Sequence, residues 1–174
     1  CRFYLLMQEG LQRYNHRILA FCLLNNHAHL AIQIGNVPLS RIIQNLSFRY
    51  TRWVNSRQKR IGHLFQGRHK AILVDADSYL LELVAYIHLN PVRAGMTDLP
   101  DAYPWSSHRA YIGSEQILWL QTEYVLAYFS QDIALEMGSG LKDCKMVASL
   151  LYGTQTPHTF SWRSLSCHLT WQCQ

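Results

Sequence analysis

Residues 18–34 of this 174-residue chain read ILAFCLLNNHAHLAIQI, and this stretch decides the fold. Two apolar runs flank the polar pair Asn25-Asn26, a pattern that predicts a β-hairpin. Side chains alternate between faces along a strand, so His27 and His29 share one face of the second strand. The residues between and after them that point the other way are all apolar, which predicts a buried second face.

The two histidines are candidate metal ligands. Strand geometry places the Cα atoms of His27 and His29 about 6.5–7 Å apart. Their imidazoles can therefore converge on one divalent cation, for which imidazole is a common ligand. The pair alone leaves an alternative open, in which both are polar residues on the solvated face of a half-buried strand.

Composition limits the classes of protein to consider. No apolar run approaches the roughly 20 residues of a membrane span, and no signal-peptide pattern opens the chain, so we expect no membrane partner. Five scattered cysteines contain no C-x-x-C pair, which indicates neither a disulfide framework nor a zinc knuckle. We therefore expect a reducing, cytoplasmic location.

The charge distribution points to a polyanionic partner. Between Leu11 and Val74 there is no Asp or Glu, whereas the same stretch holds ten of the sixteen Lys and Arg residues. Such a sign asymmetry favours nucleic acid, because each cation that contacts a phosphate releases counterions. A basic protein without a special partner is the alternative. The candidate DNA contacts are Arg41, Arg49, Arg52, Arg68 and Lys70.

Hydrophobic periodicity predicts the remaining elements. We expect a helix from Arg2 to Tyr14 and an amphipathic helix that starts at Pro38 and runs beyond Val54. A strand is predicted over residues 62–74, with Gly67 at a bulge. A helix capped by Asp75 or Asp77 should end near Asn90-Pro91 and be followed by a short helical turn over residues 91–94. Further predictions are a helix over residues 116–129, a domain over residues 1–130 and an unassigned tail over residues 131–174.

Tyr86 and Asn90 lie four residues apart on a predicted helix and so share a face. A tyrosine can act as a covalent nucleophile, and an amide oxygen can join two imidazoles around Mg²⁺ or Mn²⁺. Attack on a phosphodiester would release a 3′-hydroxyl and leave a 5′-phosphotyrosine. The alternative is a tyrosine packed at the edge of the core. His88 points away from this face, and His63 and His69 are expected to be strand residues rather than ligands.

Four blocks of sequence resemble a known family. Residues 22–30, CLLNNHAHL, resemble the C-[LM]-[ML]-x-N-H-x-H-L signature of the HUH single-strand transposases. Residues 62–74, GHLFQGRHKAILV, and 86–95, YIHLNPVRAG, are similar to blocks of the REP-associated tyrosine transposase branch, an IS200-like group. Residues 103–107, YPWSS, resemble its W-P-W-S-S block. The resemblance extends from about Arg2 to Phe129.

This resemblance implies a ferredoxin-like α+β fold in which an antiparallel sheet carries the histidines and a helix carries the tyrosine. It implies a metal-dependent nickase and strand transferase that acts on single-stranded DNA beside a hairpin formed by inverted repeats. His27 and His29 fall on the metal-binding pair, Tyr86 on the nucleophile and Asn90 on the polar third ligand. The sequence leaves open whether the protein forms a homodimer.

The chain also departs from the family pattern. Relatives begin with a strand of the form Y-H-V-T-x-R-G-N, which lies in the middle of the sheet, whereas this chain begins at the following helix. The expectation is an N-terminally truncated sequence with uncovered hydrogen-bonding edges in its sheet. Two alternatives to an active transposase follow: an inactive or domesticated copy that binds hairpin-containing single-stranded DNA, and a metal-dependent hydrolase unrelated to DNA.

Overall fold

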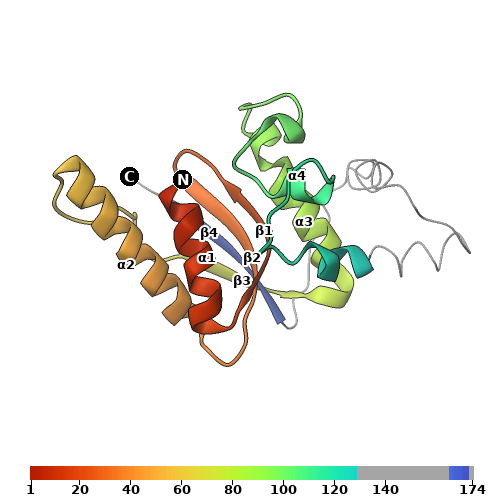
Figure 1. The fold of residues 1–174 in the computed structure, drawn as a ribbon, viewed down its shortest axis with the longest axis horizontal. Coiled ribbons are helices and arrows are strands. Elements are labelled where there is room, and N and C mark those ends of the chain that lie inside the picture. The colour runs from red at the N-terminus through yellow and green to blue at the C-terminus, as the bar shows by residue number, and fades with distance from the viewer. Residues whose placement is uncertain (129–164, 173–174) are drawn as a thin grey trace, which may run out of the picture.

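The computed structural model describes residues 1–128 and 165–172, and within them the predicted α+β class with an antiparallel sheet is confirmed. Helices and strands are interspersed along the chain (Figure 1). Their bounds are α1 Arg2–Tyr14, β1 Arg17–Leu23, β2 His27–Gln33, α2 Leu39–Gln58, β3 Lys70–Asp75, α3 Ala76–Arg93, the 3₁₀ turn η1 Pro100–Ala102, α4 His108–Tyr111 and β4 Leu165–Gln172. None of the helices among these residues is long and apolar enough to cross a membrane.

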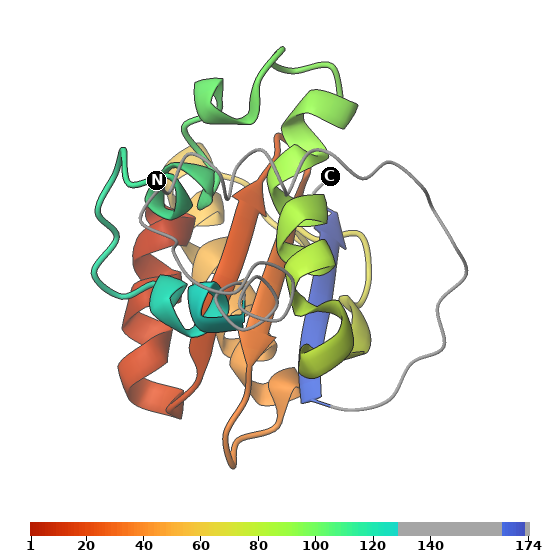
Figure 2. The same ribbon diagram turned by 90° about the vertical axis from the view of Figure 1, so that its right-hand side faces the viewer.

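The sheet has four strands in the order β1-β2-β4-β3, with each neighbouring pair antiparallel. Strand β4 comes from the segment to which the sequence pattern assigned nothing, and it lies between β2 and β3 (Figure 2). The expectation of uncovered edges where the missing strand would lie is therefore wrong, because β4 pairs with β2 on one side and with β3 on the other. Hydrogen bonds on both sides of β4 satisfy its own backbone groups and those of β2 and β3 that face it.

Helices cover both faces of the sheet (Figure 1). Helices α1 and α2 pack on the face that bears Leu30 and Ile32. The two helices and the sheet enclose a small, mainly apolar space there. Helix α3 lies on the opposite face, the one that bears His29, and crosses in front of the strands in Figure 2. The alternation of β2 therefore divides the core as predicted: Leu30 and Ile32 are buried on one side, and His29 and Ala31 on the other.

The outer edge of β1 is covered by the loop that contains the YPWSS block. The Leu23 amide donates to the Trp105 carbonyl at 2.8 Å, and the Ser107 amide donates to the Phe21 carbonyl at 2.9 Å. The Ser107 hydroxyl accepts a bond from the Phe21 amide at 2.9 Å, and the Tyr103 hydroxyl donates to the Leu23 carbonyl at 2.7 Å. This block thus protects a sheet edge, which would otherwise be open to pairing with another chain.

Three predicted boundaries are wrong. Residues 62–69 form a loop rather than a strand, because Gly62 and Gly67 both have φ of 113°, outside the extended range. Helix α3 does not stop before Pro91 but continues to Arg93. In the segment predicted as a helix over residues 116–129, only residues 122–128 are helical within the described range. The proposed boundary between domain and tail at residue 130 stays a prediction.

Candidate active site

The two histidines of β2 stand side by side at the start of the strand. The centroids of the His27 and His29 rings are 4.9 Å apart and their planes are inclined by 79°. The Asn26 side-chain oxygen lies 2.7 Å from Nδ1 of His27. Because an amide oxygen can only accept a hydrogen bond, Nδ1 carries the proton and Nε2 keeps the lone pair that a metal would use.

This geometry fits a shared cation. A ring nitrogen binds a metal at about 2.1 Å, so each ring centroid would lie roughly 3.2 Å from the ion. If the two nitrogen–metal bonds met at a right angle, the ring centroids would be about 4.6 Å apart, close to the observed 4.9 Å. Burial lowers the pKa of His27 from its usual 6.5, which favours the neutral form that ligates.

Helix α3 brings Tyr86 against this pair. The Tyr86 ring packs edge-on against His29, with 5.7 Å between centroids and 89° between planes. Tyr86 remains 38% exposed, whereas His29 is buried at 3%. The tyrosine therefore lies at the protein surface rather than in the apolar core. The predicted meeting of a hairpin histidine with a helix tyrosine is present in the fold.

Asn90 follows Tyr86 by one turn and is nearly buried. Its side-chain Nδ2 donates to the Tyr86 carbonyl at 2.8 Å, which fixes the amide along the helix. With Nδ2 committed, Oδ1 is the atom left to accept a bond or ligate a cation. Within residues 1–128 and 165–172, no three His, Cys, Asp or Glu side chains gather as a metal site. A third ligand from these described residues would thus have to be of another type, as the Asn90 amide is.

Arg93 is a site residue that the sequence pattern missed. Its guanidinium carbon lies 5.1 Å from the centroid of the Tyr86 ring. Tyr86, Asn90 and Arg93 occupy positions i, i+4 and i+7, which fall on one stripe of a helix. The spacing would have revealed Arg93 if the helix had not been expected to end at Pro91. A guanidinium in this position interacts with the face of the Tyr86 ring and can also bind an anion.

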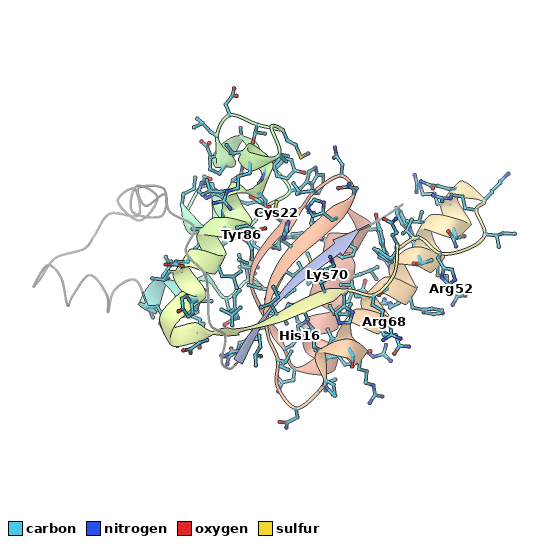
Figure 3. All side chains as sticks on the ribbon, turned by 180° about the vertical axis from the view of Figure 1, so that it is seen from behind. His16, Cys22, Arg52, Arg68, Lys70 and Tyr86 are labelled. Atoms are coloured by element: carbon cyan, nitrogen blue, oxygen red, sulfur yellow. The ribbon has the colours of Figure 1, made fainter. Side chains whose placement is uncertain are left out.

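The predicted DNA-binding residues are not all gathered at this site. Lys70 pairs with Thr170 of β4, which in turn pairs with His29, so Lys70 lies in the same row of the sheet about 10 Å from His29. Arg52 lies on α2 and Arg68 in the loop before β3, and both side chains are exposed (Figure 3).

The other two predicted contacts lie elsewhere. Arg49 forms an ion pair with Glu9 of α1, and Arg49 is the main reason that the pKa of Glu9 is lowered. Arg41 is exposed in the first turn of α2, about 16 Å along the helix axis from Arg52.

Two neighbouring groups are structural rather than ligating. Cys22 is the cross-strand partner of His29, but burial raises the pKa of its thiol to about 12, so the thiol stays protonated. His88 is fully buried, and its Nε2 lies 2.8 Å from the Ser107 hydroxyl. As expected from its position on α3, His88 is outside the site and instead ties this helix to the loop that covers β1.

An α+β domain whose sheet presents paired histidines to a tyrosine on a packed helix defines the class of protein. A family model described as "Transposase IS200 like" matches residues 2–90, which include the histidine pair, Tyr86 and Asn90. The chain belongs to the IS200-like transposase family, and it is therefore related to DNA-processing enzymes. No curated protein and no solved structure matches the chain significantly.

Proposed function

We propose that the protein is a metal-dependent endonuclease and strand transferase for single-stranded DNA, with Tyr86 as its nucleophile. The contact between Tyr86 and His29, with 5.7 Å between ring centroids, carries the proposal, because it brings the proposed nucleophile and a proposed metal ligand together. Membership in a transposase family supports a DNA substrate.

In the proposed reaction the Tyr86 hydroxyl oxygen attacks a phosphodiester phosphorus. A bond forms between that oxygen and phosphorus, and the bond from phosphorus to the 3′-oxygen breaks. The phenol proton passes to solvent, and the departing 3′-oxygen takes up a proton to become a hydroxyl. The product is a 5′-phosphotyrosine, which keeps the energy of the diester, so a second 3′-hydroxyl can attack it and reseal the strand.

His27, His29 and Asn90 are the residues proposed to hold Mg²⁺ or Mn²⁺, ions that accept imidazole and amide-oxygen ligands. Such an ion, when bound, would neutralise negative charge on the phosphate and lower the barrier to attack. Asn26 orients His27 through its hydrogen bond to Nδ1. Arg93, which lies over the Tyr86 ring, is proposed to balance charge on the phosphate and on the phenolate.

The proposed substrate is single-stranded DNA that contains a hairpin. Exposed cations at Arg52, Arg68 and Lys70 support it, because they lie in a stretch without acidic residues. A cytoplasmic location is also proposed, and it agrees with the free thiols of Cys1 and Cys22. Solution measurements of mass test whether two copies act together as a homodimer.

The decisive experiment is to look for a covalent adduct between the protein and oligonucleotides with a hairpin and single-stranded flanks, in Mn²⁺. The wild type should give a protein–DNA band that resists denaturation, and Tyr86→Phe should abolish the band while DNA binding persists. Tyr79→Phe, the same change two turns earlier on α3, is the matched control. Binding without any adduct in the wild type would favour a copy of the transposase that binds hairpin DNA and does not cut it.

A further inference from the structure

We propose that a cavity beside His27 binds one unstacked base of the single-stranded DNA, an inference that rests on the proposed function. The cavity has a volume of about 100 Å³ and lies between α1, α2 and the hairpin turn. Its wall is mainly apolar and aromatic, with polar groups from the turn and from the histidine. The residues that matter most here are Phe3, Leu23, Asn25, His27, Tyr50 and Phe65.

The aromatic wall continues outward along α2 as a stack. The Tyr50 ring packs edge-on against Phe3 at 5.1 Å and lies nearly parallel to Trp53 at 6.0 Å, with 22° between their planes. The guanidinium carbon of Arg57 lies 5.7 Å from the centre of the Trp53 ring. These α2 residues occupy positions i, i+3 and i+7, so they form one stripe from the cavity toward solvent.

Nucleotide chemistry matches this arrangement better than a protein side chain does. Proteins bind single strands by stacking bases on aromatic rings and by placing cations along the backbone. Trp53 is 38% exposed, and Arg57 provides a cation at the outer end of the stack. Neither an aspartate nor a glutamate is among the described residues that line the cavity.

The cavity and the proposed catalytic site share one residue, His27. His27 contacts His29 on one side and lines the cavity on the other. The proposal requires a strand with its phosphate at Tyr86, on the face covered by α3, to pass the His27 end of β2 and place a neighbouring base in the cavity beside α1 and α2. The exposed amide of Asn25 at this end can hydrogen-bond to the edge of such a base.

The test separates the contribution of the base to binding affinity from that of the phosphates. Binding is measured for a thymidine oligonucleotide about twelve nucleotides long and for an abasic oligonucleotide of the same length, which carries the same charge. The wild type should bind the thymidine strand about tenfold more tightly, the ratio expected from one stacked base. In Tyr50→Leu this ratio should fall close to one. Phe48→Leu, on the same helix but 65% exposed and away from the cavity, should keep the wild-type ratio.

A second measurement does not depend on how well a variant folds. An oligonucleotide with 2-aminopurine at single positions should show quenched fluorescence at one position when it binds the wild-type protein. Equal affinity for thymidine and abasic strands, or quenching at no position, would overturn the base-binding cavity. Adduct formation at Tyr86 is scored separately, so an intact adduct with a flat base dependence would reject this inference alone.

Discussion

The Tyr86 ring stands perpendicular to the ring of His29, with 5.7 Å between their centroids, although the two residues belong to different layers of the fold. Because of this contact, a substitution at the histidine on β2 can be tested by its effect on the tyrosine of α3. A change at His29 should affect the chemistry of Tyr86 without removing the surface that binds DNA. Variants can therefore separate catalysis from binding.

The histidine pair should be needed for cleavage, and His29, which does not line the proposed base cavity, should not be needed for binding. His29→Ala or His27→Ala should lower the rate of adduct formation in Mn²⁺ by about 100-fold or more, because loss of charge neutralisation at the phosphate raises the barrier. Gel assays of the adduct and anisotropy assays of binding measure the two effects. His63→Ala, in the exposed loop before β3, should leave both unchanged. A cleavage rate unaffected by either site substitution would remove the metal from the mechanism.

Arg93 should assist the attack by Tyr86. Arg93→Gln should slow adduct formation by about 10- to 100-fold, since one charge next to the reacting phosphate is lost, and Arg93→Lys should restore part of the rate. Arg13→Gln is the matched control, because Arg13 also lies over a tyrosine, Tyr14, at 5.6 Å but on α1. Equal slowing by Arg13→Gln would assign the effect to overall charge.

Strand β4 should be essential to the stability of the sheet. Proline at residue 169 would remove a backbone donor from the middle of a strand that pairs with Leu30 on one side and Ala71 on the other. We expect Leu169→Pro to lower the free energy of unfolding by about 3 kcal/mol or more. Thermal and urea unfolding measure this loss.

Leu118→Pro is the control for that substitution. Leu118 is exposed at the second position of a turn that the Leu120 amide closes on the Ile117 carbonyl at 3.0 Å, a position that proline tolerates. If Leu169→Pro unfolds no more easily than Leu118→Pro, the segment does not form the central strand.

Buried histidines should make the protein less stable in mild acid. Burial lowers the pKa of His16, His88 and His108 below the usual 6.5, most strongly for His88. The unfolded chain therefore takes up protons that the folded chain does not as the pH falls below about 6.5. Stability should be constant with respect to these groups above that pH and decline below it. Urea unfolding from pH 7.5 to 5 should show this slope, and His63→Ala, which changes an exposed histidine, should not alter it.

Local patterns predicted the hairpin, α1, most of α2 and the positions of Tyr86 and Asn90 on one helix face. These predictions succeeded because period-two and helical periodicities depend on residues close in the chain. Pro91 caused the main local error. Proline lacks an amide hydrogen and crowds the preceding turn, yet the helix continues past Pro91 to Arg93, so a residue of the candidate site was left outside the predicted helix.

The sequence by itself determined that two histidines face the same way on a strand, that a tyrosine and an amide share a helix face, and that acidic residues are absent from a long basic stretch. Only the tertiary structure decided that Tyr86 meets His29, that Arg49 is neutralised by Glu9, and that residues 165–172 form a central strand. The physical reason is that these outcomes depend on which layers and strands pack together, and such choices balance burial and backbone pairing over the whole domain rather than over neighbouring residues.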